Sequence, residues 1–457
     1  LSLWEKNQRG MDAESFLTQI ETDLLQWYIE RVREMGYKGL VSQFDYLQNL
    51  RYAVPRNLTD VVSMHGYHAH PSDYTNPGSK ISQESAVGQA ANWFRGMAAT
   101  RFGDRPFMLT EYGHVYWNRY RYEEGLMMGA YSALQDYDGL MAHSEPVTVT
   151  PGIIKPFLVN MDPVARASQV VSGFVFARRD VQPAPHYVNL EIRPEELYRV
   201  DNIHSGVNSE QGRLSLVTGF GLSYTGNKPP AGVQPRRADV TLHAGSGAQV
   251  IATSAFATLV DSPGGKFSAA EFVAGLKASG LLPATNRTDI ARGLYGSETG
   301  QIFLDTLSKL MTVRTPRLEG ASFENLKTPL HLDALTVTSS TVPANVTAIA
   351  LDDTNLAASR HMLLVYATDA LNSNSEYEKE DRTVLRKIGT LPVLLRTGEV
   401  KLSLANQNAA RLKAWALGMD GTRKEALPVA VENGVLSLTI NTRNVVSPSP
   451  FFEIAEN

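Results

Sequence analysis

Apolar residues within positions 1–182 follow two spacings, one typical of amphipathic helices and one typical of short buried strands. At residues 14–35 they recur every three or four positions, which predicts a helix that ends at Gly36. The same spacing predicts three further helices, at residues 82–101, 121–135 and 162–178. Asp162 and Pro163 suit the N-cap and the first position of the last helix. Uninterrupted apolar runs predict four strands, at residues 39–44, 60–64, 106–110 and 139–142. Alternation of helix and strand favours a parallel sheet.

From about residue 183 the helical spacing almost disappears, and short alternating segments separated by turn residues take over, which is typical of an all-β sandwich. Short helices are still expected at residues 268–279 and 289–293. The dipeptide Asn433-Gly434 predicts a two-residue hairpin turn, and residues 227–235 are expected to form a linker. We therefore expect three regions, at residues 1–182 (α/β), 183–325 (mixed, mostly β) and 326–457 (β-sandwich).

Composition excludes several classes of function. The 43 Lys and Arg residues against 47 Asp and Glu give a net charge of −4, which argues against a nucleic-acid-binding protein with a strongly basic face. The chain has no cysteine, so it has no disulfide, thiol nucleophile or cysteine-based metal site. No apolar run is long enough to predict a membrane span, and no signal peptide is visible. The compartment stays open, with export expected if an upstream segment carries a signal peptide.

Polar and aromatic side chains follow each of the four predicted strands. In chain order they are Gln43 and Asp45, then His65, Tyr67 and His68, then Glu111 and Tyr112, and finally His143 and Glu145. Because the carboxyl ends of parallel strands meet at one edge of a sheet, we expect these side chains to form one substrate-binding site. Asp136 and Asp138 precede the last strand, at its far end, and are expected to have structural roles.

Glu111 is the strongest catalytic candidate. The apolar strand at residues 106–110 delivers it to the expected site, where Tyr112 and Gly113 turn the chain. A carboxylate held rigidly at a strand end can act as a nucleophile or a base, whereas a glutamate in an ordinary loop is more often an ion-pair partner. Glu145 is a second carboxylate on the same side, with a salt bridge as the simpler interpretation.

His65, His68 and His70 allow two interpretations. Histidine pairs at strand ends bind metals in some barrel hydrolases, but the other strand ends offer no obvious bridging ligand. We therefore predict no metal site, and expect His65 and Tyr67 to hydrogen-bond the substrate and to orient Glu111.

Trp117 lies in the loop that follows Glu111. Aromatic rings near a carboxylate suit the apolar face of a sugar. Trp117, Tyr112 and His143 are therefore expected to line a sugar subsite, although each of them singly is more often a packing residue.

Taken together, these residues resemble the C-terminal half of a retaining glycoside hydrolase barrel of the large cellulase-like clan. The resemblance rests on the order of the strand that ends near His65 and Tyr67, the segment PFMLTEYG with Glu111, and the segment ALQDYDGLMAHS. It covers about residues 36–182, and more loosely the tail to residue 457. It implies the last four βα units of a (β/α)8 TIM-type barrel followed by a β-sandwich, a β-linked carbohydrate substrate, Glu111 as the nucleophile, and no cofactor.

The sequence departs from this clan in one important respect. Such enzymes need a second carboxylate as acid/base after the fourth barrel strand, usually in an Asn-Glu pair, and no such pair ends a predicted strand here. We expect an upstream or separate half-barrel segment to supply it, because no apolar strand precedes the other candidate, Glu5. The open alternatives are a non-catalytic carbohydrate-binding or structural module, a metal-dependent hydrolase using the three histidines, and an enzyme outside sugar chemistry on an open α/β sheet.

Overall fold

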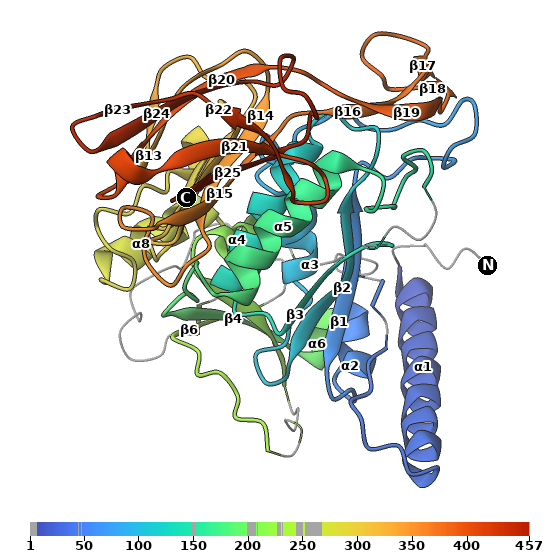
Figure 1. Ribbon diagram of the computed structural model, residues 1–457. Helices are drawn as coiled ribbons and strands as arrows, with labels where there is room; N and C mark the ends of the chain where they lie inside the picture. Colours follow the sequence, from blue (N-terminus) through green and yellow to red (C-terminus); the bar gives the residue numbers. More distant parts are fainter. Residues whose placement is uncertain are drawn as a thin grey trace.

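The computed structural model of the protein has an α/β region followed by an all-β region with large sheets (Figure 1). The structure describes residues 7–43, 45–46, 48–145, 147, 151–198, 207, 209–225, 230, 232–243, 250–251 and 267–456. None of the helices in these ranges combines the length and the apolar composition that crossing a bilayer requires.

The α/β region begins with a long helix and continues with parallel strands separated by shorter helices. In chain order its elements are α1 (Gln8–Glu34), η1 (Leu50–Tyr52), α2 (Ala53–Arg56), β1 (Val62–His68), α3 (Asn92–Ala98), β2 (Phe107–His114), η2 (Arg121–Glu123), α4 (Glu124–Leu134), β3 (Gly139–Ala142) and α5 (Pro163–Ala177). Strands β1, β2 and β3 form a parallel sheet in that order. Among the described residues this sheet does not close into a barrel.

A second, mainly parallel sheet follows, in the region that the sequence predicts to be mixed and mostly β. Its region contains β4 (Tyr187–Ile192), α6 (Pro194–Leu197), α7 (Ser209–Gly212), η3 (Arg213–Leu216), β5 (Gly219–Tyr224), β6 (Val240–His243), β7 (Val250–Ile251), α8 (Ala269–Ala278) and η4 (Ile290–Arg292). Strands β5 and β6 both pair in parallel with β4, and only β7 is antiparallel. Part of the expected linker at residues 227–235 lies outside the described residues.

The all-β region consists of short antiparallel strands. They are β8 (Leu294–Gly296), β9 (Ile302–Asp305), β10 (Leu310–Arg314), β11 (Leu318–Phe323), β12 (Leu330–His331), β13 (Leu335–Ser340), β14 (Ala344–Ala350), β15 (His361–Ala367), β16 (Ala370–Ser373), β17 (Glu376–Tyr377), β18 (Leu385–Lys387), β19 (Thr390–Leu395), β20 (Glu399–Ala405), β21 (Lys413–Leu417), β22 (Arg423–Leu427), β23 (Val429–Glu432), β24 (Val435–Asn441) and β25 (Phe451–Ala455), with η5 (Ala409–Arg411) before β21.

Two of its sheets share a hydrophobic core. One has the order β22-β21-β25-β15-β14-β11-β10-β9-β8, and the other has the order β12-β13-β20-β24-β23. Buried side chains of both sheets, such as Val346 and Leu402, belong to one cluster. The first sheet runs across the expected boundary at residues 325–326, since β8 to β11 belong to it and β11 pairs directly with β14.

Helix α4 lies between the α/β region and the large sheet of the all-β region. All its residues are buried, because it packs between α5 and strands β10 and β11. Gly125 and Gly129 allow α5 to approach closely: a Cβ at Gly125 would lie 2.3 Å from the carbonyl oxygen of Ser168. The α/β region and the large sheet therefore share a continuous core.

Two of the predicted elements are wrong. Residues 39–44 form no strand where they are described; instead the segment lies beside β1, where the His65 amide donates to the Asp45 carbonyl at 2.7 Å. The expected helix at residues 82–101 is confined to α3. The buried Glu123 carboxylate accepts hydrogen bonds from Ser85 Oγ and from the Val87 amide, and this competes with helix formation at residues 85–87.

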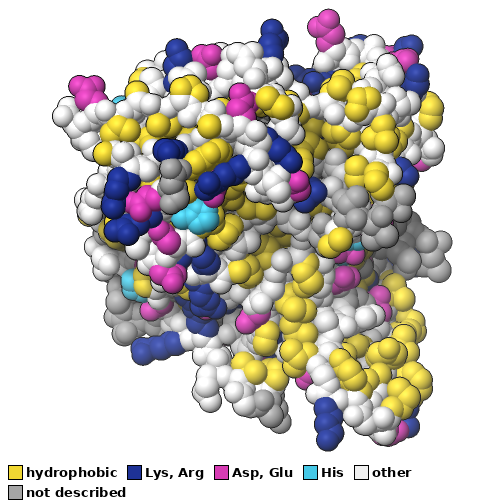
Figure 2. All heavy atoms as spheres, viewed as in Figure 1, with side chains coloured by type: hydrophobic (Ala, Val, Ile, Leu, Met, Phe, Trp, Pro, Cys, Tyr) yellow, Lys and Arg dark blue, Asp and Glu magenta, His cyan; other side chains and the backbone are white. Residues whose placement is uncertain are grey.

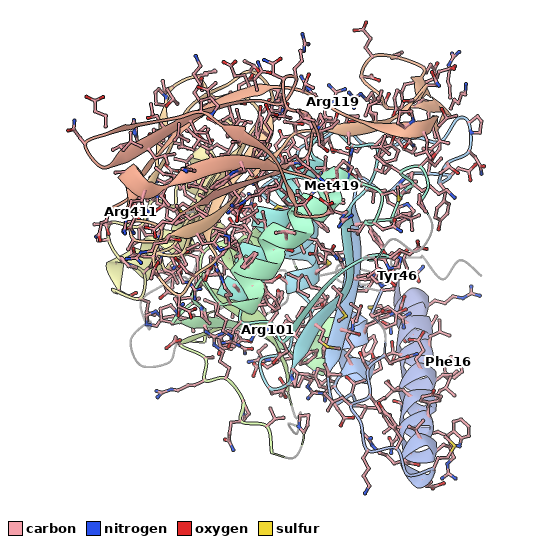
Figure 3. The ribbon with its side chains drawn as sticks, in the orientation of Figure 1. Phe16, Tyr46, Arg101, Arg119, Arg411 and Met419 are labelled. Atoms are coloured by element: carbon pink, nitrogen blue, oxygen red, sulfur yellow. The ribbon has the colours of Figure 1, made fainter. Side chains whose placement is uncertain are left out.

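Helix α1 leaves much of its apolar face uncovered. Its inner face carries Glu14 and Glu21, which pair with Arg51 at 2.8 and 2.7 Å. Five large apolar side chains on the outer side are exposed: Phe16, Ile20, Leu24, Trp27 and Tyr28. Figure 2 shows hydrophobic side chains gathered over this helix, and Figure 3 labels Phe16 among them.

Candidate active site

The carboxyl-terminal halves of β1 and β2 present their side chains to two different faces of the sheet. In the parallel register His65 pairs with Glu111 and Tyr67 with Gly113, so these residues share one face. Gly66 pairs with Tyr112 on the other face, which is covered by helices. Both strands run past their expected ends, and β2 continues through the turn expected at Tyr112 and Gly113, so Glu111 lies within β2 and not at its end.

A β-bulge decides which face Glu111 occupies. Met64 pairs with Leu109 but His65 pairs with Glu111, so Thr110 is an extra residue in the ladder. Its hydroxyl lies 3.4 Å from the Met64 carbonyl oxygen. Without the bulge, Glu111 would face the helices together with Leu109, and Thr110 would take its place at the site.

Glu111 is held by the hydroxyl of Tyr67, which donates a hydrogen bond to Oε2. Nδ1 of His143 lies 3.8 Å from the same oxygen. Burial, together with the hydrogen bond to Glu111, raises the pKa of Tyr67, so the phenol stays protonated and remains a donor. The Glu111 side chain is 35% exposed, so solvent or a ligand can reach the carboxylate.

Asp45 and His65 form a second polar pair near Glu111. Nδ1 of His65 lies 3.4 Å from Asp45 Oδ2, and the Thr110 hydroxyl lies 3.4 Å from the same oxygen. Gln43, which precedes this pair, is exposed. The predicted residues His65, Tyr67, Glu111, His143 and Asp45 are thus brought together.

Three predicted site residues lie elsewhere. Tyr112 is buried, with its hydroxyl 3.2 Å from Ser172 Oγ on α5. His68 is buried against His114, with Nε2 2.9 Å from the Glu84 carbonyl oxygen.

Trp117, the third, is fully buried, and its indole nitrogen donates to the Arg382 carbonyl oxygen at 2.9 Å. No face of its ring is open to a sugar. The expectation that Trp117 and Tyr112 line a sugar subsite is therefore corrected, because both side chains are used in packing.

Glu145 lies near the site edge but is directed to its own loop. It is exposed, and Asn160 Nδ2 donates to its Oε2 at 3.4 Å. The acid/base candidate Glu5 falls outside the described residues.

The three histidines considered as metal ligands have separate partners. His65 lies beside Asp45, His68 contacts the Glu84 carbonyl, and Nδ1 of His70 lies 2.8 Å from the Pro71 carbonyl oxygen. Burial lowers the pKa of His68, which favours its neutral form. Within the described part of the chain, no group of three or more His, Asp or Glu side chains is arranged to hold a metal ion.

Sequence reasoning missed Phe157, whose ring packs edge-on against Tyr67 at 4.7 Å and lies 6.4 Å from His143. It belongs to the loop that follows β3. The available signal was an aromatic residue after a predicted strand end, but the distance of 15 residues from Ala142 hid the connection.

No family model matches this chain, and neither the curated proteins nor the solved structures include a significant match to it. The resemblance to a retaining glycoside hydrolase barrel therefore remains a prediction from the sequence.

Proposed function

We propose that this chain carries the nucleophile of a retaining glycoside hydrolase that acts on a β-linked oligo- or polysaccharide. The observation that supports the proposal best is the accessible Glu111 carboxylate, held by the Tyr67 hydroxyl within a group of imidazole and aromatic rings. In this proposal the α/β region is the last part of a TIM-type barrel, and the two large sheets form an appended β-sandwich.

The proposed reaction has two displacements. Tyr67 and His143 both approach Oε2 of Glu111, so we assign Oε1 to the attack on the anomeric carbon. The new bond joins Oε1 to that carbon while the glycosidic C–O bond breaks, and the leaving oxygen takes a proton from the acid/base. Water, deprotonated by the same group, then releases the sugar from Glu111. The acid/base remains assigned to a segment outside this chain.

The exposed apolar side of α1 supports such a further segment. Large apolar side chains such as Phe16, Leu24 and Trp27 lie there in one stripe, and a helix of a barrel normally buries such a stripe against neighbouring βα units. If an upstream or separate half-barrel packs against α1, adding it should shift the fluorescence of Trp27 to shorter wavelength, measured as the difference from Trp27→Phe. An unchanged emission in the complex would contradict this arrangement.

An activated substrate tests Glu111 in the chain as it is. The dinitrophenolate of a 2,4-dinitrophenyl 2-deoxy-2-fluoro-β-glycoside leaves without protonation, so the first displacement needs no acid. The fluorine slows the second displacement, so the glycosyl-enzyme accumulates. With the gluco, galacto, manno or xylo reagent we expect one sugar per chain by intact mass spectrometry, on the peptide that contains Glu111.

Glu111→Gln should remain unlabelled, whereas Glu145→Gln, the matched change at an exposed carboxylate near the same edge, should be labelled like the unaltered chain. Absence of labelling with all four reagents, or labelling of another residue, would overturn the proposal. Binding of a polysaccharide without labelling would favour the alternative, a non-catalytic carbohydrate-binding module.

A further inference from the structure

The loop that follows β1 carries an exposed tyrosine, Tyr74, and hydrogen bonds within the loop fix its conformation. Tyr74 is 59% exposed, and its backbone is left-handed, with φ of +44°, which is unfavourable for an aromatic residue. The loop is closed beneath it by hydrogen bonds: the Ser72 amide donates to the Lys80 carbonyl at 2.8 Å, and the Asp73 amide donates to Ser79 Oγ at 3.0 Å. Tyr74 is therefore displayed by an ordered loop.

A continuous series of rings connects Tyr74 with the candidate nucleophile. Tyr74 lies 5.7 Å from Phe157 and 6.0 Å from His70, ring centre to ring centre. His70 and Phe157 lie 5.1 Å apart, and Phe157 lies 4.7 Å from Tyr67, which binds Glu111. Tyr74 and His70 belong to the loop after β1 and Phe157 belongs to the loop after β3, so rings from two loops lie together beside Tyr67 and the carboxylate.

The all-β region holds these loops in place. A segment of it, residues 369–396 with β16 to β19, extends over the loops at the upper end of β1 and β2 (Figure 1). Its main chain pairs with the loop after β1, where the Gly78 amide donates to the Leu385 carbonyl at 2.7 Å and the Ile81 amide donates to the Thr383 carbonyl at 2.9 Å.

The same segment contacts the loops after β2 and β3. The Arg382 carbonyl accepts the indole hydrogen of Trp117 at 2.9 Å. Asn372 bonds both main-chain groups of Ile154, at 2.8 and 2.9 Å, and so fixes the loop that carries Phe157. The loops after β1, β2 and β3 are thus each tied to residues 369–396.

We propose that Tyr74, His70 and Phe157 form a sugar-binding platform beside Glu111, assembled by residues 369–396. The inference rests on the proposed function, because the platform adjoins Glu111 and its ligand is a pyranose ring of the same β-linked oligosaccharide. The Tyr74 side chain is largely exposed, and an exposed aromatic ring suits the apolar face of a pyranose. The neighbouring imidazole of His70 can hydrogen-bond the hydroxyl groups of the sugar. The substrate therefore extends beyond the sugar that Glu111 attacks.

Calorimetric titration of the Glu111→Gln chain tests the platform without turnover. The probes are hexasaccharides of β-1,4-glucan, β-1,3-glucan, β-1,4-xylan and β-1,4-mannan. For the one that binds best, adding Tyr74→Ala should weaken binding about tenfold, a typical effect of removing one stacked ring. Tyr74→Phe should bind normally, because the ring and not the hydroxyl makes the contact. Tyr28→Ala, which removes a tyrosine of similar exposure (55%) from α1, is the matched control and should have no effect.

The experiments distinguish a failure of the platform proposal from a failure of the proposed role of Glu111. In chains that keep Glu111, labelling by the monosaccharide reagent should be the same with and without the Tyr74→Ala substitution, since that reagent does not reach the platform. An unchanged affinity for the hexasaccharide in the Tyr74→Ala chain, or no binding of any of the four probes, would overturn the platform. Loss of labelling with retained Tyr74-dependent binding would overturn the nucleophile and leave the platform intact.

Discussion

Arg121 forms a buried ionic link between the α/β region and the all-β region, which the substitution Arg121→Met would break. Its Nε lies 2.8 Å from Asp162 Oδ2, and its Nη1 lies 3.5 Å from Asp369 Oδ1. The three side chains are only 2%, 2% and 5% exposed. The guanidinium also donates to the carbonyl oxygens of Asn118, at 2.6 Å, and Ala370, at 2.9 Å.

The expected loss of folding stability follows from the buried carboxylates that Arg121→Met leaves without their partner. Burial by itself lowers the pKa of Arg121, but Asp162 and Asp369 outweigh it and raise the pKa, so the group stays charged. Removing one partner of a buried ion pair costs about 3–5 kcal/mol. Asp369 keeps its contact with Arg382 at 2.7 Å, and Asp162 still accepts from the Val164 amide at 2.9 Å. We therefore expect the lower end, about 3 kcal/mol.

Urea unfolding, monitored by near-UV circular dichroism, measures this loss of stability as a change in the free energy of unfolding. Arg31→Met, which breaks an exposed pair on α1, is the control and should change it by less than about 0.5 kcal/mol. In the Arg121→Met background, Asp162→Asn should restore part of the stability, because it removes an uncompensated charge and keeps the N-cap acceptor. A loss below about 1 kcal/mol for Arg121→Met, or equal destabilisation by Asp162→Asn in both backgrounds, would refute this reasoning.

Three further substitutions have defined outcomes. Tyr67→Phe keeps the ring but removes the hydrogen bond to Glu111. Labelling by the fluoroglycoside should slow about tenfold, because a hydrogen bond to a charged group is worth about 1.5 kcal/mol, and the melting temperature should not change. Equal labelling rates would show that the hydroxyl does not act on the carboxylate. Burial raises the pKa of Glu124 to about 8 from 4.5, so the folded state binds its proton more tightly, and the stability should fall as the pH rises from 5 to 8. Glu124→Gln should reduce that slope in urea titrations at both ends of this range, and an unaltered slope would contradict the assignment. Gly434→Ala, at φ of +77°, should cost about 1 kcal/mol in thermal unfolding, and no loss would count against a strained turn.

The sequence by itself determined the elements whose signals are local. Asn433 and Gly434 have φ of +50° and +77°, as the two-residue turn between β23 and β24 requires, and few other residue pairs adopt these angles easily. Asp162 caps α5 by accepting from the Val164 amide, as predicted from its position before Pro163. The apolar run at residues 106–110 does lead into a strand that carries Glu111, with Phe107 and Leu109 buried. In each case neighbouring residues alone set the backbone preference.

The tertiary structure decided which side chains face the site. Simple alternation along β2 from Phe107 and Leu109 would place Glu111 on the helix-covered face. Tyr112 lies on that face instead, because Thr110 is inserted as a bulge when β2 pairs with β1. A bulge changes the face of every later residue, and pairing with a distant strand creates it, so no local pattern encodes it. The burial of Trp117 beneath Arg382 has the same origin, since a segment 265 residues further along the chain covers the indole. Spacing in the sequence predicts elements, but strand register and contacts between distant segments set the direction of their side chains.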